Sequence, residues 1–306
     1  MELDVLAPTW TAPLLRRMAE VRRVIVNPLS HGEFNLRARL RLARSLKTEA
    51  YDEAVVLPNS WKSALIPFIA GIPLRTGFVG EARYLLLNRL HRYDQRTLPQ
   101  LAMRYAKLAE AAAAQPTQPL AGPRLISTPE QQAAAREALA LSPQGPPVVF
   151  CPGAEYGPAK RWPARHFAAL ANKLGNATKP VWLIGSEKDR ALGDEIAQAA
   201  RGAALNLCGR TTLEQAIDLL AAARLVVAND SGLMHVAAAL ERPLLALYGS
   251  SSPEFTPPLS SQAKIIATGI ACSPCFQRVC PLGHFKCLED LTPERVLQHL
   301  DRHAYP

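Results

Sequence analysis

The sequence predicts an α/β protein built from two Rossmann-like domains that face a central cleft. Short apolar segments alternate with helix-like segments in both halves of the 306-residue chain, a pattern typical of parallel sheets covered by helices. A stretch rich in Ala, Gln and Pro between residues 111 and 147 separates the halves. We therefore predict domains over 1–120 and 147–306, joined by a linker over 121–146.

The expected elements follow from apolar periodicity and from the Pro and Gly signals at their ends. In the first domain they are strands at 3–6, 24–26 and 54–57 and helices at 35–46 and 98–114. The linker is expected to contain one short helix, at 129–141. In the second domain we expect strands at 148–151, 180–184, 205–207, 225–228 and 244–248, and helices at 164–174, 189–200, 213–223 and 231–240. No internal repeat is visible.

We expect an anion-binding corner after the strand at 225–228, where apolar residues give way abruptly to Asp230, Ser231 and Gly232. A helix N-terminus presents unpaired N–H groups and a positive dipole end, which favour phosphate. Asp230 and Ser231 are able to cap the helix, and Gly232 lacks the Cβ that would keep a diphosphate away. His235 lies one turn further on. The alternative is an ordinary capped helix with a packed histidine.

A second corner of the same kind follows the strand at 148–151, in a loop that contains Gly153, Gly157 and Lys160. Pro163 marks the start of the next helix. Ligands of open parallel sheets bind at the carboxyl ends of the strands, so Lys160 is a candidate phosphate clamp. A simply solvated lysine is the alternative.

Composition narrows the class of partner. The chain has 35 Lys and Arg against 26 Asp and Glu, a formal charge of +9 that favours anionic partners. No nucleic-acid-binding motif is found, so we expect no nucleic-acid partner. The arginines that crowd the first fifty residues form either a solvated surface or a landing zone for a phosphorylated lipid or an anionic membrane face. Without a long apolar run or a signal-peptide pattern, the protein is expected to be cytoplasmic.

Six cysteines fall into two groups. Cys151 and Cys208 stand alone in apolar segments and are predicted to lie in the core. The other four are close in sequence and are compatible with a structural zinc site, with His284 as a further potential ligand; they are Cys272, Cys275, Cys280 and Cys287. Their spacing is not that of a standard zinc ribbon, so free thiols in a surface loop are the alternative.

Several segments resemble the family of ADP-heptose lipopolysaccharide heptosyltransferases, specifically its heptosyltransferase II branch. In the second half they are CPGAEYGPAKRWP at 151–163, NDSGLMHVAAAL at 229–240 and RPLLALYGSSSPEFTPPLS at 242–260; in the first half they are LPNSWKSAL at 57–65 and GIPLRTGFVGEARYLLLN at 71–88. The resemblance implies an inverting glycosyltransferase of the GT-B fold that needs no metal and no cofactor for transfer.

The resemblance also implies donor-site roles. Ser231, Gly232 and His235 match positions that hold the diphosphate, and Asp230 matches one that engages the heptose hydroxyls. Lys160 matches the cation that offsets charge on the leaving diphosphate, the catalytic role expected here. The nucleoside side corresponds to Gly185, Ser186, Asp189, Thr211 and Thr212. Among these, Asp189 is suited to ribose hydroxyls, with a helix-capping carboxylate as the alternative, and the two threonines lie near the expected adenine.

Acceptor recognition is expected in the first domain. Asn59, Ser60, Lys62 and Ser63 follow the strand at 54–57, which we expect to be buried, so their polar groups should emerge at the cleft edge. Arg75 and Arg83 are able to meet acidic groups of the acceptor through bidentate contacts, although surface ion pairs are the alternative for each.

One feature departs from the family pattern. Members open with a strand, a glycine-rich turn and a helix, and the turn carries an aspartate taken as the general base. Here Met1 is followed at once by LDVLAPTW, which resembles the second strand. We therefore expect an incomplete first domain with no general base, because Asp52 and Asp94 lie in unsuitable contexts. The explanations are a start codon placed too far downstream, a shortened chain, or a binder that has lost catalysis, and we favour the first because the loss would expose apolar surface.

The resulting hypothesis is heptose transfer from ADP-heptose to the first heptose of the inner core. The acceptor partner would be a phosphorylated heptosyl-Kdo lipid A, and the enzyme would contact the cytoplasmic face of the inner membrane peripherally. Heptosyltransferase I, acting one step earlier on Kdo, and a catalytically silent sugar-nucleotide binder are the alternatives.

Overall fold

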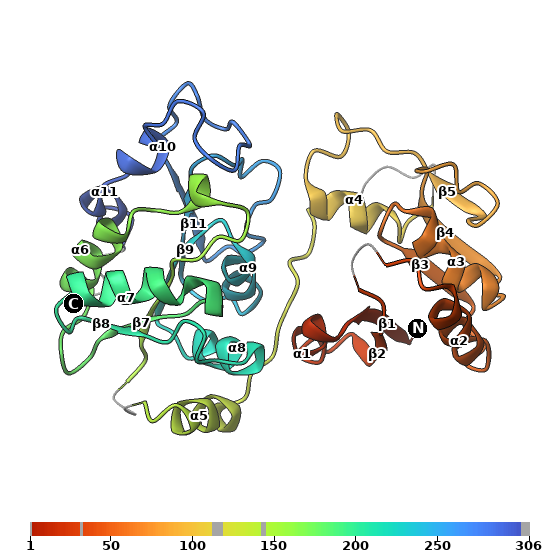
Figure 1. Ribbon diagram of the computed structural model, residues 1–306, viewed down its shortest axis with the longest axis horizontal. Helices are drawn as coiled ribbons and strands as arrows, with labels where there is room; N and C mark the ends of the chain where they lie inside the picture. Colours follow the sequence, from red (N-terminus) through yellow and green to blue (C-terminus); the bar gives the residue numbers. More distant parts are fainter. Residues whose placement is uncertain (1, 31–32, 112–118, 142–144, 301–306) are drawn as a thin grey trace. The chain divides into compact units, whose positions relative to one another are not determined.

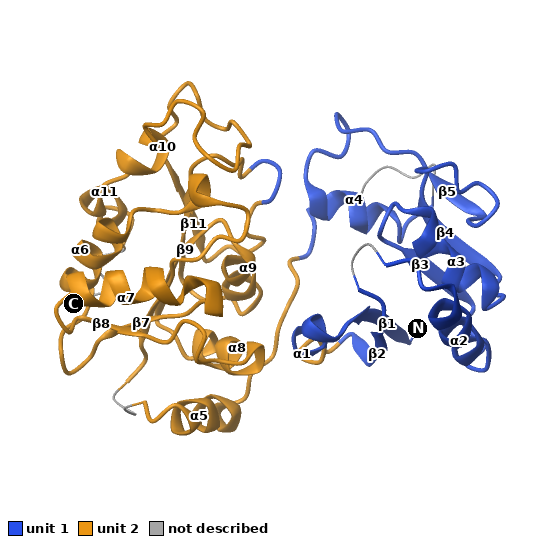
Figure 2. Cartoon of the chain, in the orientation of Figure 1, with its two compact units in different colours: residues 1–15, 20–121, 254–256 blue, residues 16–19, 122–253, 257–306 orange. Residues whose placement is uncertain are grey.

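The computed structural model describes residues 2–30, 33–111, 119–141 and 145–300 (Figure 1). The chain is an α/β protein with parallel sheets, as predicted, and it divides into two compact units (Figure 2). Unit 1 comprises residues 1–15, 20–121 and 254–256, and unit 2 comprises 16–19, 122–253 and 257–306. No helix in the described part of the chain is both long and apolar enough to span a bilayer.

Unit 2 is organised around a six-stranded sheet in which every neighbouring pair is parallel. Its order is β11-β10-β9-β6-β7-β8. The strands are β6 (Val148–Cys151), β7 (Val181–Leu183), β8 (Ala204–Asn206), β9 (Leu225–Asn229), β10 (Leu244–Tyr248) and β11 (Ala263–Ala267). The predicted strands of this half are confirmed, and β11 was not predicted. Every residue of β6, β9 and β10 is buried, as expected of strands with apolar side chains on both faces.

Helices cover this sheet and complete its core (Figure 1). They are α6 (Ala164–Leu174), α7 (Arg190–Ala199), α8 (Leu213–Ala221), α9 (Gly232–Ala239), α10 (Lys286–Glu289) and α11 (Pro293–Leu297). The side chains of Trp162, Phe167 and Phe150 are fully buried and in ring contact, Trp162 and Phe167 edge to face at 4.8 Å. Burial of each such ring contributes about 1.5–3 kcal/mol to folding.

Residues 122–146, most of the segment predicted as a linker, group with unit 2. It contains α5 (Pro129–Ala138), which begins with a capping box between Thr128 and Gln131 and packs against α8. Before α5, the Leu125 N–H donates to the Ala239 carbonyl at 2.9 Å. The described part of this segment is thus held to unit 2 by a backbone hydrogen bond and by the packing of α5.

Unit 1 has two smaller parallel sheets. One pairs β1 (Leu3–Pro8) with β2 (Val21–Asn27), and the other has the order β3 (Glu53–Val56), β4 (Leu74–Phe78), β5 (Arg89–His91). The helices are α1 (Ala12–Leu15), α2 (Leu36–Lys47), α3 (Trp61–Ile69) and α4 (Leu101–Lys107). Helix α4 is shorter than the predicted 98–114, whose residues 112–114 lie outside the described part, and α3, β4 and β5 were not predicted.

The strands of unit 1 form two separate sheets, whereas those of unit 2 form one. In unit 2, β6 lies between the pair β7-β8 and the trio β9-β10-β11; unit 1 has the pair β1-β2 and the trio β3-β4-β5. Among the described residues, no strand joins the two sheets of unit 1. Strand β3, expected to be buried, is correspondingly open: the apolar side chain of Val55 is 44% exposed, and that of Leu57 beyond it 46%. An apolar strand with no neighbour on one edge exposes surface that a central strand would bury.

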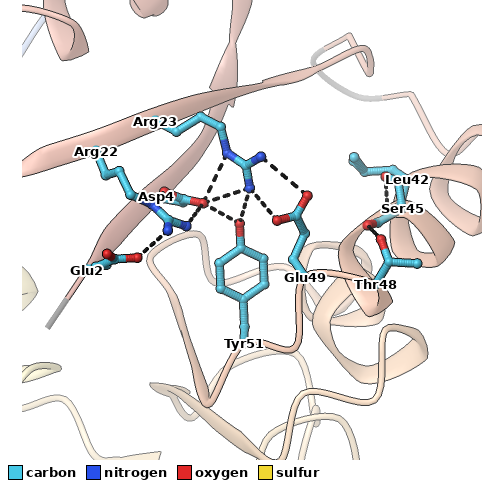
Figure 3. A network of polar contacts seen from close by, with 9 residues as sticks. All are labelled: Glu2, Asp4, Arg22, Arg23, Leu42, Ser45, Thr48, Glu49 and Tyr51. Carbon is cyan, nitrogen blue, oxygen red and sulfur yellow. Dashed lines mark hydrogen bonds and ion pairs between the residues drawn. The ribbon is translucent and has the colours of Figure 1, made fainter.

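A network of polar contacts centred on Asp4 joins β1 to β2 and to the chain before β3 (Figure 3). Arg22 and Arg23 each place a guanidinium nitrogen within 2.9 Å of the Asp4 carboxylate, and the Tyr51 hydroxyl donates to it at 2.5 Å. The Asp4 side chain is only 2% exposed. Hydrogen bonds from Arg22, Tyr51 and Arg23 outweigh burial and hold the pKa of Asp4 far below its usual range.

Asp4→Asn should therefore destabilise unit 1 at neutral pH, because the variant keeps the volume but loses the charge that the two arginines face. A carboxyl group with a lowered pKa contributes stability above its unfolded-state pKa, about 3.9, and loses it as pH falls through the folded-state value. The difference in urea midpoint between wild type and Asp4→Asn should thus be largest above about pH 5 and shrink on acidification. Asp52→Asn, at an exposed position of the same unit, is the control. A difference that is constant from pH 7 to pH 3 would contradict this account.

Candidate functional site

The candidate site of unit 2 lies where β6, β9 and β10 end. Cys151 of β6 is in register with Ala228 of β9, and Asn229 of β9 is in register with Leu247 of β10. Because all three strands run in the same direction, the residues that follow them gather at one edge of the sheet. The two corners that the sequence predicted therefore belong to a single site.

Lys160 and Asp230 form the ion pair of this site. Lys160 closes the short 3₁₀ turn Pro158–Lys160, and its Nζ lies 2.5 Å from Oδ2 of Asp230, directly after β9. The two side chains are 18% and 6% exposed, and the Tyr156 ring lies 5.2 Å from the ammonium. Weak hydration of such a pair strengthens its attraction. Asp230 is thus engaged by Lys160, so its predicted role as a helix cap is wrong.

The N-terminus of α9 is left open. Ser231 is the N-cap residue, but its side chain makes no capping hydrogen bond, and its buried Oγ has no partner. Gly232 is exposed, and a Cβ built there would meet no atom within 4 Å. The predicted capping by Ser231 is therefore also wrong, and the free N–H groups of the first turn face space that an anion is able to fill.

His235 and Tyr248 are weakly hydrated polar groups within electrostatic range of the ion pair. Burial lowers the pKa of His235, with Lys160 adding to the effect and Asp230 opposing it. The imidazole is therefore neutral at neutral pH and offers one donor and one acceptor. Burial, assisted by Asp230, raises the pKa of Tyr248 and keeps its phenol protonated.

The predicted nucleoside corner forms at the end of β7. Asp189 is buried, and its Oδ2 accepts hydrogen bonds from the Ser186 N–H at 2.9 Å and the Ser186 hydroxyl at 2.7 Å. This is the capping arrangement that the sequence left as the alternative. Oδ1 of Asp189 lies 3.9 Å from Arg161, the residue after Lys160, which links this corner to the ion pair.

Glycines make the close approach at this corner feasible. A Cβ on Gly153 would lie 2.5 Å from Oδ2 of Asp189, and one on Gly185 would lie 3.0 Å from its Cβ. Thr212 is the N-cap of α8 and its hydroxyl accepts from the Gln215 N–H, whereas Thr211 precedes it at a partly exposed position. Thr212 thus caps α8, and its contact with adenine stays a prediction.

Sequence reasoning missed three polar residues of the site. Asn229 is fully buried, with its side chain bonded to the loop that carries Lys160. Ser250 and Ser251 follow β10, are 1% and 6% exposed, and have hydroxyls without a partner. The signal was available, because small polar residues directly after an apolar strand were used to identify Asp230 and Ser231.

The predicted acceptor residues lie in unit 1, in and just before α3. Asn59 is exposed, and Ser60 and Lys62 are partly exposed. Oδ1 of Asn59 accepts a hydrogen bond from Arg83 at 3.2 Å, and the Ser60 hydroxyl contacts that of Ser63 at 3.2 Å. These side chains are accessible to a ligand of unit 1.

The two arginines predicted beside them have structural partners. Arg83 is 2% exposed, and its guanidinium donates to backbone carbonyls of Phe78, Pro58 and Ser60. Its predicted acceptor contact is therefore wrong, since a buried guanidinium surrounded by carbonyls cannot reach a ligand. Nε and Nη1 of Arg75 donate to the Leu86 and Ile72 carbonyls at 2.7 and 2.6 Å, which favours a structural role for Arg75 as well.

The two carboxylates considered as general bases remain unsuitable. Asp52 and Asp94 are both exposed, and Oδ1 of Asp94 accepts from the Arg96 N–H at 2.9 Å. Neither follows a glycine-rich turn. The absence of a base from this chain stays a prediction.

The predicted cysteine zinc site is not supported. Four thiols line one small cavity of about 20 Å³, but the described residues contain no group of three or more His, Cys, Asp or Glu side chains able to hold a metal ion; the thiols are Cys272, Cys275, Cys280 and Cys287. Their surroundings differ: Cys272 is exposed and Cys287 is buried, while backbone N–H groups of residues 282–285 lower the pKa of Cys280. None of the four forms a disulfide in the described structure, and Cys287 lies in α10 and not in a surface loop. Cys151 and Cys208 are buried, as predicted.

Gly153→Ala should destabilise the folded protein at the site. The new methyl group would overlap the Asp189 carboxylate, so we expect a loss of about 1–3 kcal/mol of unfolding free energy, the usual cost of overpacking. Gly232→Ala is the matched control, because its methyl group meets nothing and should change the unfolding free energy by less than about 0.5 kcal/mol. Urea unfolding measures both, and equal stability of the two variants would show that the contact with Asp189 does not constrain Gly153.

Comparisons with known proteins agree on the family. Residues 39–286 match the model for glycosyltransferase family 9 (heptosyltransferase). A lipopolysaccharide heptosyltransferase 2 of Salmonella typhimurium is 48% identical over 307 residues, 97% of this chain and 88% of the relative. The structure of E. coli ADP-heptose LPS heptosyltransferase II has a TM-score of 0.87 at 44% identity and covers 99% of this chain and 89% of that one.

A first-branch enzyme is less similar. A lipopolysaccharide heptosyltransferase 1 of Pseudomonas aeruginosa is 32% identical over 169 residues, which are 53% of this chain and 46% of the relative. The family model spans most of the chain, and the Salmonella typhimurium heptosyltransferase 2 matches 97% of its length. The chain therefore belongs to glycosyltransferase family 9, the heptosyltransferases.

Proposed function

We propose that this enzyme transfers heptose from ADP-heptose to the first heptose of a phosphorylated heptosyl-Kdo lipid A, with inversion at the anomeric carbon and without a cofactor. One observation carries the proposal: an open helix N-terminus lies beside a lysine–aspartate pair at the carboxyl edge of the sheet in unit 2. This combination suits an activated sugar whose diphosphate is the leaving group.

The diphosphate would occupy the space next to Gly232, where it receives N–H groups of α9 and the hydroxyls of Ser231 and Ser251. Lys160 would then turn from Asp230 to the diphosphate, because negative charge grows there as the glycosidic bond breaks. The freed Asp230 carboxylate would accept hydrogen bonds from the heptose hydroxyls. Neutral His235 supports this arrangement with a donor that adds no charge.

The nucleoside would extend toward the end of β7. Gly185 and Gly153 let the Asp189 carboxylate approach the end of β7, and Ser186 is exposed there. Asp189 has one carboxylate oxygen occupied by Ser186, so only Oδ1 is available for a ribose hydroxyl. Thr211 and Thr212 would lie beside the adenine.

The acceptor would be recognised by unit 1 through Asn59, Ser60 and Lys62, which are accessible there. Membrane contact would be peripheral and on the cytoplasmic face. Its support is a row of exposed arginines along α2, Arg37, Arg41 and Arg44, whose spacing of three to four residues places them on one side of the helix. Arg17 and Arg39, in contrast, have internal partners and do not contribute.

A transfer assay with two acceptors tests the proposal. Purified chain, ADP-heptose and either heptosyl-Kdo lipid A or Kdo-lipid A are incubated, and the products are weighed by mass spectrometry. We expect a heptose to be added to the heptosylated acceptor. If heptose is added to Kdo-lipid A and not to the heptosylated acceptor, the activity is that of a heptosyltransferase I. If ADP-heptose binds but neither acceptor gains a heptose, the chain is a catalytically silent sugar-nucleotide binder.

Gly232→Ala provides a specific check on the donor site. Its methyl group fits the folded protein but enters the space assigned to the diphosphate, so the KM for ADP-heptose should rise by about tenfold, equivalent to about 1.4 kcal/mol. The KM for the acceptor should change little. An unchanged donor KM in a normally folded variant would argue against diphosphate at α9.

A further inference from the structure

Asn229 holds the loop that carries Lys160. This last residue of β9 is fully buried, and its side chain bonds both ends of the loop between β6 and α6. Its Nδ2 donates to the Pro152 carbonyl at 2.7 Å, and its Oδ1 accepts from the Trp162 N–H at 3.1 Å. Pro152 directly follows β6, and Trp162 comes two residues after Lys160.

The orientation of this amide is unambiguous. A backbone N–H only donates and a carbonyl only accepts, so the oxygen must face Trp162 and the nitrogen must face Pro152. Among side chains of this size, only an amide supplies one acceptor and one strong donor in that arrangement without charge.

The far end of the loop is fixed independently of Asn229. Trp162 is fully buried, and its indole N–H donates to the Leu291 carbonyl at 2.6 Å. Within the loop, the Lys160 N–H donates to the Gly157 carbonyl at 3.2 Å. The Ala159 N–H donates to the Arg278 carbonyl at 3.1 Å, and the Asn229 amide connects the loop to β9. The residue after Asn229 is Asp230, the partner of Lys160.

We propose that Asn229 is a positioning residue that acts through Lys160, an inference that rests on the proposed function. By bonding Pro152 and Trp162, it holds the loop in the conformation that places the Lys160 ammonium 2.5 Å from Asp230. Misplacement of a charged group by about 1 Å is enough to reduce turnover by about a hundredfold.

A double-mutant cycle tests this inference. Asn229→Ala removes both hydrogen bonds, and Asn229→Thr is a less disruptive second variant in case the first folds poorly. Each is combined with Lys160→Met, which keeps the aliphatic chain and removes the charge. Asn206→Ala is the matched control, because Asn206 ends β8 and also bonds its neighbours through both amide atoms, to Cys208 N–H and to the Arg190 carbonyl.

In the background with wild-type Lys160, we expect Asn229→Ala to lower kcat by about 10–100-fold. In the Lys160→Met background the loss should be less than about threefold, because the effects of substitutions in groups that act as a unit are not additive. Asn206→Ala should cost the same factor in both backgrounds. Urea unfolding of every variant shows whether stability alone explains the losses.

Two failures are distinguishable. If Lys160→Met impairs transfer and Asn229→Ala costs the same factor in both backgrounds, Asn229 has only a structural role and the inference is wrong. If Lys160→Met by itself leaves transfer unchanged, the role proposed for Lys160 is wrong, and the positioning role of Asn229 falls with it.

Discussion

The parallel pairing of β6, β9 and β10 is the constraint on which the donor site depends. It places the loops after three strands at one edge of the sheet, although they are far apart in the sequence: Lys160 and Asp230 are 70 residues apart and lie 2.5 Å from each other. Local forces alone would not bring them together. The sheet supplies the frame, and the Asn229 amide fixes the loop upon it.

The two units show what a central strand contributes. In unit 2, β6 is buried along its whole length and its loop carries Lys160. Unit 1 has the same order of flanking strands without such a strand among its described residues, and apolar side chains of β2 and β3 are correspondingly exposed. The Asp4 network provides a polar connection between β1 and the chain before β3, which no strand of the described residues joins.

Much of the second unit could be predicted because its strands are apolar on both faces. The expected strand at 148–151 coincides with β6, and the helix at 164–174 with α6. Unit 1 was harder. Pro67 lies inside α3 and obscures the helical signal, and Arg75 interrupts the apolar pattern of β4.

In the site, the topology predicted that the loops after neighbouring strands lie together at the sheet edge, and the sequence identified Asp230 and Lys160 as candidates. A local sequence pattern does not encode side-chain packing. It therefore could not predict that Lys160 pairs with Asp230, that the Ser231 hydroxyl has no hydrogen-bond partner, or that Arg83 is buried.

The central claim is that Lys160 and the backbone N–H groups at the N-terminus of α9 bind the diphosphate of the donor. Calorimetric titration of ADP and of AMP into wild type and Lys160→Met tests it most directly. The account predicts that Lys160→Met weakens ADP binding by at least about tenfold and AMP binding much less, because AMP lacks the second phosphate. Equal ADP affinity of the two proteins would contradict it.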